Sequence, residues 1–448
     1  MGTDVVETQI GSWLDHVRTH RELTAADAAE LEDHLRGRID DLVAVGLQPD
    51  EAFLVAVKRM GSIDALTREF AREHSDRLWK QLVLGGEDAE RRPTSEIVVV
   101  LAFAVGAAVL VKIPQLLGVG LDTDGDVAFY ARNLACFALA PLAGYLLWSR
   151  GASTRTWGAV AGLFAVGIVA ANAFPLDADG SATVLTAVHL PIALWLVVGV
   201  AYAGEGWRDG QARMDFIRFT GEWVIYLALL ALGGGVLAGV VLGTFNATGN
   251  DASEFVGSVL LPCGAAGAVV VAAWLVEAKK SVVENMAPVL GLVFTPLFVI
   301  ALTALVSVLV VTGGLDVDRD ALIVFDLLLV LVLGLLVYGI SARNGAAVWP
   351  DRMQLVLVVA ALLVDAIVLA VLCSRIGEFG FSANKTAALG ENLVLLANLG
   401  WSAYLLLRVV RRSAPLAVLQ RWQTSYLVVY AAWAWAVVLL FPIAFGFD

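Results

Sequence analysis

The order of polar and apolar positions divides the chain into two parts. Residues 1–93 carry apolar side chains at helical spacing among charged ones, which predicts amphipathic helices. From residue 94 onward, apolar stretches of about 20 residues or more recur, long enough to cross ~30 Å of hydrocarbon as helices. Eleven spans are predicted, at about residues 96–118, 127–148, 155–176, 182–204, 219–245, 254–277, 286–313, 321–341, 353–373, 386–408 and 424–446.

Four amphipathic helices are predicted within residues 1–93. The second has its apolar face on Ala28, Leu31, Leu35, Ile39, Leu42 and Val43. Gly46 is placed to end this helix, and Pro49 begins a third helix that contains Phe53. The first and fourth helices are predicted at about residues 5–20 and 62–82.

Composition agrees with a membrane protein. The 448 residues are 59% hydrophobic and 16% charged, whereas soluble domains are roughly 45–50% apolar and about 25% charged. These values exclude an ordinary soluble enzyme, a disordered protein and a disulfide-rich secreted module. The net charge of −12 argues against a nucleic-acid partner. We therefore expect an all-α polytopic bundle of about eleven helices in a lipid bilayer, with a small N-terminal cytosolic helical domain.

The charges define two predicted domains. Residues 1–93 hold 12 Lys/Arg and 19 Asp/Glu, and the remaining 355 residues hold 18 and 23. The prediction is an acidic cytosolic prefix at 1–93, without a signal peptide, followed by a transmembrane domain at 94–448. The three cysteines, Cys136, Cys263 and Cys373, lie in apolar runs and show no metal or disulfide spacing.

Basic residues predict the orientation of the helices. If residues 1–95 are cytoplasmic, the outer loops contain only Arg319, Arg375 and Lys385. The inner loops contain thirteen: Arg150, Arg155, Arg208, Arg213, Arg218, Lys279, Lys280, Arg343, Arg352, Arg408, Arg411, Arg412 and Arg421. The positive-inside rule then places the N-terminus in the cytoplasm and the C-terminus outside. Arginine-rich, lysine-poor usage indicates a high-GC bacterium, and hence a bacterial cytoplasmic (inner) membrane.

Six polar residues fall inside the predicted spans and form the candidate intramembrane polar cluster: Lys112, Arg132, His189, Asp326, Asp365 and Glu391. A charge at the bilayer centre costs roughly 2.5–3.5 kcal/mol on insertion scales, so such residues normally face the bundle interior or water. Their offsets from the predicted helix ends place all six in the outer half. Buried ion pairs or snorkelling side chains are the structural interpretation. A site for a substrate, an ion or a lipid headgroup is the functional one.

Two further patterns have a structural and a functional interpretation. Gly235, Gly239 and Gly243 form a small-residue ridge, which predicts close helix packing or a flexible transport helix. Acidic outer loops at 122–126, 177–179 and 316–320 could hold Ca²⁺ or Mg²⁺, or serve a polyprenyl-sugar glycosyltransferase. Because these loops are very short, solubilising turns are the favoured interpretation, and no metal or cofactor is expected.

One resemblance lies in the prefix. The run Leu31-Glu32-Asp33-His34-Leu35-Arg36, with Gly46-Leu47, Asp50-Glu51-Ala52-Phe53 and Met60-Gly61-Ser62, resembles the permease prefix domain of bacterial membrane proteins over about residues 20–72. The resemblance implies a small helical cytosolic module fused to transporters or other multi-pass proteins. It implies no chemistry. The module is either a folding or assembly cap or a docking site for a cytosolic protein partner.

A second resemblance lies near the end of the ninth span. Arg375, Phe379, Gly380, Ser382 and Lys385 stand at the positions of a motif in the multi-pass family catalogued as domain of unknown function 4153, which has no assigned activity. Lys385 stands where that family usually has arginine. Physically, the segment predicts an outer hairpin in which Ser382 caps the next helix, Glu378 pairs with Arg375, and Asn392 bonds within the bundle. The alternative is recognition of an anionic headgroup or peptide by Arg375 and Lys385.

Three functions remain open. The sequence contains no nucleophile elbow, HExxH or Walker A motif, so no catalytic residue is assigned. The first hypothesis is a gradient-driven or partner-driven permease whose polar cluster lines a pathway. The second is a signalling or scaffold protein whose prefix docks a cytosolic regulator. The third is a polyprenyl-lipid transferase. The sequence indicates neither an oligomeric state nor a substrate.

Overall fold

The computed structural model describes residues 94–120, 124–278, 287–311, 319–341, 343 and 347–447. Within the first 93 residues it describes positions 32–33, 35–37, 39, 42–43, 47, 52–53 and 55–56. The chain divides into two compact units, Met1–Thr94 and Ser95–Asp448.

The N-terminal unit contains a small apolar core of its own. Its buried residues are Leu35, Ile39, Ala52, Phe53 and Ala56, with Leu42 and Leu47 packed against them. Leu35 and Ile39 were expected on the apolar face of the second helix, whereas Val43, expected there too, is 38% exposed. The helices predicted at residues 5–20 and 62–82 lie outside the described residues, as does most of the prefix motif.

The second unit is built from long helices. Ten segments are long and apolar enough over their described residues to cross a membrane, and α13 adds an apolar helix whose described side chains begin at Phe294. The long helices are α5 (Thr94–Leu116), α6 (Asp124–Ser149), α7 (Thr154–Ala173), α8 (Ser181–Ala203), α9 (Gly210–Ala247), α11 (Leu261–Ala278), α13 (Ala287–Val311), α14 (Arg319–Ser341), α15 (Val348–Phe379), α16 (Ala383–Val410) and α17 (Leu416–Ala444). Three short elements join them: η1 (Gly204–Gly206), α10 (Ser253–Phe255) and the π-helix η2 (Val256–Leu260). The described part of the chain has no β-strand, and the predicted all-α multi-pass bundle is confirmed.

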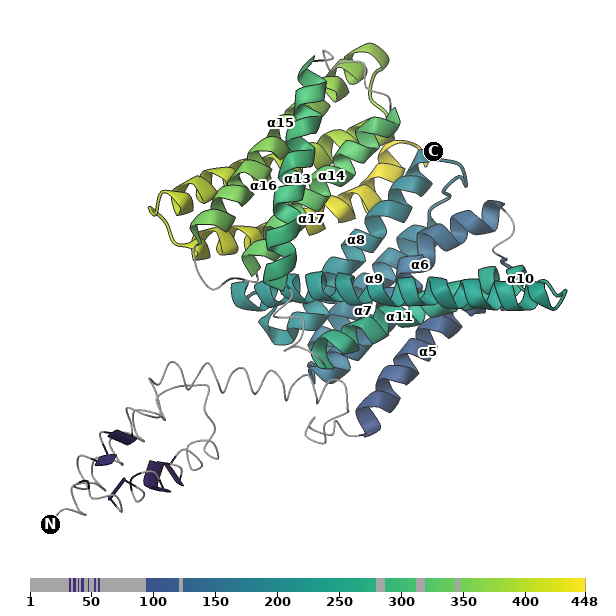
Figure 1. The fold of residues 1–448 in the computed structure, drawn as a ribbon. Coiled ribbons are helices and arrows are strands. Elements are labelled where there is room, and N and C mark those ends of the chain that lie inside the picture. The colour runs from purple at the N-terminus through teal and green to yellow at the C-terminus, as the bar shows by residue number, and fades with distance from the viewer. Residues whose placement is uncertain are drawn as a thin grey trace. The chain divides into compact units, whose positions relative to one another are not determined.

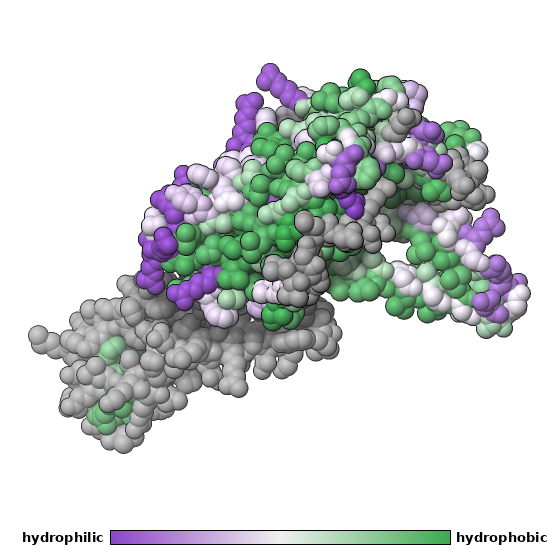
Figure 2. Space-filling model, turned by 90° about the horizontal axis from the view of Figure 1, so that it is seen from above, coloured by the Kyte–Doolittle hydropathy of each residue, from purple (hydrophilic) through white to green (hydrophobic). Residues whose placement is uncertain are grey.

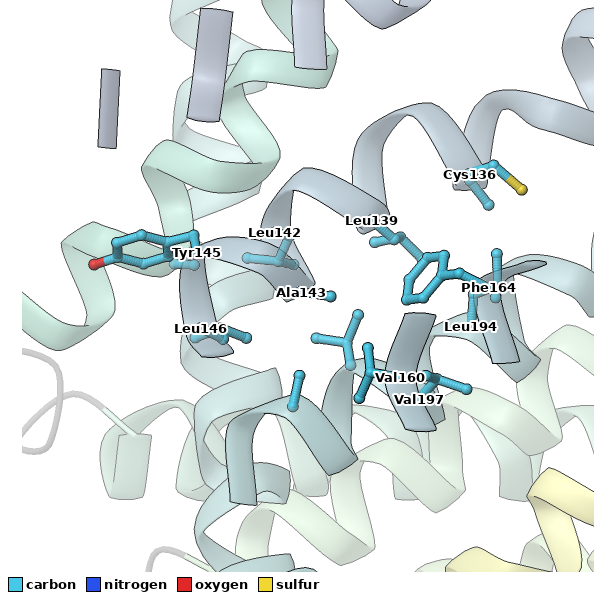
Figure 3. Packing of buried hydrophobic residues seen from close by; sticks show 14 of the residues in the cluster. Cys136, Leu139, Leu142, Ala143, Tyr145, Leu146, Val160, Phe164, Leu194 and Val197 are labelled. Carbon is cyan, nitrogen blue, oxygen red and sulfur yellow. The ribbon is translucent and has the colours of Figure 1, made fainter. Parts of the chain in front are cut away.

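The long helices form two groups that share a seam (Figure 1). The first group, α6 to α9 with α11, packs around one large apolar core. In that core Phe164 of α7 lies beside Leu194 of α8 and Leu139 of α6 (Figure 3). The second group, α13 to α17, packs around another core. The groups meet where α8 contacts α17 and where α9 contacts α14.

The outer surface of the second unit is apolar, as expected where lipid is the solvent. Hydrophobic side chains cover most of its visible face, and hydrophilic ones gather toward the ends of the helices (Figure 2). Leu232, Val236, Ile300 and Leu327 are each 67% exposed or more. Such a surface would aggregate in water, but it needs no cover in a bilayer. The chain is therefore an integral membrane protein.

Two helices extend beyond the apolar stretches that predicted them. Helix α9 begins at Gly210 rather than near residue 219, because its first turns alternate charged residues with the buried Met214 and Phe216 and so have a low mean hydropathy. Helix α15 ends at Phe379 rather than near residue 373. The extension of α15 changes the depth of every residue on it, which matters for the site below.

Candidate functional site: an acid cluster between α14, α15 and α16

Three carboxylic acids and one amide meet in the second helix group. They are Asp326 of α14, Asp365 of α15, and Glu391 and Asn392 of α16, and we refer to them as the acid cluster. The amide nitrogen Nδ2 of Asn392 donates to Oδ1 of Asp326 at 2.9 Å and to the carbonyl of Ala388 at 2.8 Å. Asp326 also interacts electrostatically with both Asp365 and Glu391. Helix packing thus gathers four polar residues from three helices.

Asp365 is one of the two fully buried members of the acid cluster. Its exposed fraction is 0%, and neither of its carboxyl oxygens has a hydrogen-bond partner. Asn392 is also 0% exposed, and its Oδ1 has no partner. Buried polar atoms in folded proteins are nearly always hydrogen-bonded. Three buried oxygens therefore stand without a donor from the described chain.

No basic residue offsets these acids. Within the described residues, Asp326, Asp365 and Glu391 form no ion pair with Lys, Arg or His. The described residues therefore give no support to locking ion pairs at these three acids. The electrostatic interactions that connect them are between like charges, which repel when the groups are ionised.

The longer α15 moves Asp365 away from the helix end. Asp365 was expected about 12 Å inside the helix, but it lies fourteen residues before Phe379, about 21 Å at the rise of an α-helix. On the other side, seventeen residues separate it from Val348. Asp365 therefore lies near the middle of α15, where a charge is most costly for a membrane helix.

Apolar side chains enclose the acid cluster along the same three helices. Leu329 of α14, Val364 and Val368 of α15, and Leu395 of α16 belong to the buried core of the second group. Low polarity strengthens every electrostatic interaction of an enclosed group. The carboxyl oxygens of Asp365 therefore suit a small, positively charged occupant. Among the residues that the structure describes, no three His, Cys, Asp or Glu side chains lie close enough to hold a metal ion together.

Lys112, predicted as part of the same cluster, has a different role in the first helix group. Its ammonium donates to the backbone carbonyl of Ser258 at 2.8 Å and also bonds the side chain of Gln115. In a regular helix, that carbonyl would accept the N–H of residue 262, which is Pro262 and has none. Ser258 lies within the π-helix η2, and Lys112 supplies its carbonyl with a donor close to the proline that interrupts the backbone bonding.

Within the described residues, Arg132 and His189 form no hydrogen bond or ion pair with the acid cluster. Arg132 is half-buried on α6, and its Nε has no partner. The helices of Lys112 and Arg132, α5 and α6, pack with the first group and not against α14, α15 or α16. His189 is 4% exposed, and its Nδ1 lies 2.9 Å from the carbonyl of Leu185 on its own helix. The structure therefore brings together three of the six predicted residues, and Asn392 joins them.

The predicted hairpin between α15 and α16 is short and well bonded. Gly380 ends α15 with a φ of 74°, and Ser382 caps α16 by accepting from the N–H of Lys385, as predicted. The ammonium of Lys385 donates to the carbonyl of Gly380 at 2.9 Å and lies over the ring of Phe379. These contacts favour the structural interpretation of Lys385.

The turn is shorter than the predicted motif. Arg375, Glu378 and Phe379 belong to the last turns of α15 rather than to a loop. Arg375 is half-buried, whereas Glu378 and Phe379 are exposed.

The glycine ridge of α9 does not pack against another helix of the described chain. A Cβ added at Gly235, Gly239 or Gly243 would meet no other heavy atom within 4 Å. Within the described residues these glycines therefore make no close helix contact, and their packing role stays a prediction. Tight glycine contacts occur elsewhere: a Cβ on Gly390 would lie 1.9 Å from the ring of Trp433, and one on Gly221 would lie 2.2 Å from that of Tyr338.

Sequence reasoning missed two buried acids, Asp351 of α15, which is 2% exposed, and Glu222 of α9. Glu222 of α9 is 4% exposed and lies close enough to Tyr338 of α14 to interact electrostatically. It falls inside the span predicted at residues 219–245, so its charge within an apolar stretch was a usable signal.

Comparisons of the chain with protein families, with curated proteins and with solved structures found no match.

Proposed function

We propose that the chain is a gradient-driven, permease-like protein of a bacterial cytoplasmic membrane, in which the acid cluster binds and releases a proton. One observation carries the proposal. Asp365 is fully enclosed near the middle of its helix, and neither of its oxygens has a partner. Intramembrane acids of this kind commonly belong to ion or proton pathways.

The energetics favour a proton as the occupant. An ionised carboxylate without a partner is very costly in an apolar environment. No basic side chain supplies the compensating charge in the described chain, so a bound proton does so. Asp326 and Glu391 provide neighbouring carboxyl groups, and the negative charge of ionised Asp326 favours the protonated form of the other two acids. Release of the proton then requires a change in the access of the site to water.

The architecture supplies a route for alternating states. The acid cluster spans three helices of one group, which meets the other group along several helix contacts, chiefly that of α8 with α17. Movement of one helix group against the other would change the access of a site in the interior of one group. The resemblance of the α15–α16 region to domain of unknown function 4153 adds a family context without an activity.

A signalling or scaffold function is the second candidate. The separate apolar core around Leu35 and Phe53 supports it, because a module that packs its own core can dock a partner independently of the membrane domain. In this proposal the prefix, which resembles the permease prefix domain, is cytoplasmic and binds a cytosolic protein. The excess of Lys and Arg in the predicted inner loops over the outer loops gives the same orientation.

A pH step applied to the reconstituted protein tests the proposal. Full-length chain in liposomes is adsorbed on a solid-supported membrane, and the transient current is recorded as protons enter the protein. The wild type should give a current above that of empty liposomes. Asp365→Asn should reduce it to the empty-liposome level, because the amide cannot take up the proton.

The matched control is Glu378→Gln, which removes an exposed carboxylate from the end of the same helix. This variant should keep the wild-type current. A thermal unfolding scan of each purified variant checks that the bundle is intact. A wild-type current no larger than that of empty liposomes, or an undiminished current in folded Asp365→Asn, would contradict the proposal.

A further inference from the structure

A pocket lies at the opposite end of the second helix group from the α15–α16 hairpin. It forms where α15 begins and where α16 turns into α17, and its volume is about 460 Å³. Val348, Val409, Val410 and Pro415 give it an apolar wall, and Arg412 and Ser413 give it a polar edge. The pocket thus combines an apolar surface with a cationic rim.

The turn after α16 holds Arg412 in an unusual conformation. Its φ is 56°, in the left-handed region that favours glycine. The N–H of Arg412 bonds the carbonyl of Val409 at 2.9 Å, and the N–H of Ser413 bonds that of Arg408 at 2.8 Å. These two bonds form a Schellman motif, which usually has glycine at the position of Arg412. The chain thus carries an arginine where a glycine would be less strained.

The charges around the pocket favour an anion. The guanidinium of Arg412 has no hydrogen-bond partner in the described part of the chain, and the neighbouring Arg411 is exposed. The one acid in the wall is Asp351. Its carboxylate accepts from Arg343 at 2.8 Å and from the N–H of Ala347 at 2.8 Å, so its charge is already compensated.

The position of the pocket favours a lipid over a soluble anion. Trp349, beside Val348 at the start of α15, is 60% exposed. Exposed tryptophans at the ends of membrane helices lie at the level of the headgroups. An anion at Arg412 would therefore lie at headgroup depth, with apolar side chains beside it to contact the glycerol and acyl region.

We propose that this pocket binds one anionic phospholipid, with its phosphate at Arg412 and its apolar part against Val348, Val409, Val410 and Pro415. The lipid compensates the unpaired guanidinium through charge-assisted hydrogen bonds. This inference is independent of the proton proposal, because it uses neither the acid cluster nor any movement of the helices.

The test measures thermal unfolding of full-length protein in detergent as phosphatidylglycerol is added, with phosphatidylcholine as the zwitterionic reference. The decisive variant is Arg412→Gly. Glycine suits the left-handed turn, so the lipid-free variant should be at least as stable as the wild type. Its apparent affinity for phosphatidylglycerol should nevertheless fall by about tenfold, since one charge-assisted bond is lost.

Arg155→Gln is the matched control, because Arg155 is exposed at the start of α7 and does not line the pocket. This variant should bind phosphatidylglycerol as the wild type does. Equal loss in both variants would show a diffuse charge effect and overturn the proposal, as would unchanged binding by Arg412→Gly. Equal stabilisation by inorganic phosphate alone would show a soluble-anion site and would also overturn it.

Discussion

The contact between Lys112 and the backbone of Ser258 gives a prediction that can be worked out quantitatively. Pro262 has no N–H to bond the Ser258 carbonyl in α-helical register, and the ammonium of Lys112 donates to that carbonyl at 2.8 Å. Substitution of Lys112→Met keeps the length of the side chain and removes the donor. The half-buried carbonyl of Ser258 then loses its side-chain donor.

The expected loss follows from the cost of an unsatisfied buried group. Leaving a buried acceptor without a donor costs about 1–3 kcal/mol, so Lys112→Met should lower the free energy of unfolding by about 2 kcal/mol. Pro262→Ala restores a backbone N–H at position 262 and makes the lysine redundant. In the Pro262→Ala background, the loss of unfolding free energy caused by Lys112→Met should be smaller by about 1–2 kcal/mol. This difference is the interaction energy of the cycle, and it lies in the usual range for residues in direct contact.

The assay is a double-mutant cycle, measured by titrating the purified protein in mixed micelles with a denaturing detergent. Lys385→Met is the control, because the ammonium of Lys385 also bonds a carbonyl, that of Gly380, but at an exposed turn. Its cost should stay below about 0.5 kcal/mol, as is usual for surface substitutions. A cost of Lys112→Met that is the same in both backgrounds, within about 0.5 kcal/mol, would refute the reasoning.

Two other predictions concern packing and orientation. Gly390→Ala places a Cβ against the ring of Trp433 and should destabilise the bundle by about 1–3 kcal/mol in the same assay. Gly239→Ala is the control and should be neutral, because a Cβ there would meet no heavy atom within 4 Å. Equal effects of the two alanines would contradict the packing described here. In a cysteine-free background, a cysteine at position 381 should react with an impermeant thiol reagent added outside intact cells, and one at position 411 only after the cells are opened. The reverse labelling would invert the proposed orientation.

Hydropathy predicted the helices well, because the length of a membrane span is fixed by the bilayer. It could not place the ends of α15, since Arg375 and Glu378 are as compatible with the last turn of a helix as with a loop. It missed the first turns of α9 for a related reason. That segment alternates charged residues with buried apolar ones, so its average hydropathy is low although it is helical.

The acid cluster shows a second limit. Each acid was identifiable singly as a charge inside an apolar stretch, but which acids meet depends on helix neighbours that a single sequence does not specify. Lys112 was placed in the wrong cluster because its partner is a backbone carbonyl close to Pro262, which is 150 residues away in the sequence. Asn392 had a predicted amide bond within the bundle, but its partner, Asp326, emerged only from the packing of α14 against α16.

The measurement that tests the central claim most directly is infrared difference spectroscopy of the reconstituted full-length protein during a pH titration. A proton on Asp365 gives the carbonyl stretch of a carboxylic acid, which is distinct from the bands of a carboxylate. The account predicts a carboxylic-acid band that disappears as the pH is raised, and that is absent from Asp365→Asn but present in Glu378→Gln. The same band at full strength in Asp365→Asn, or no pH-dependent band in the wild type, would contradict it.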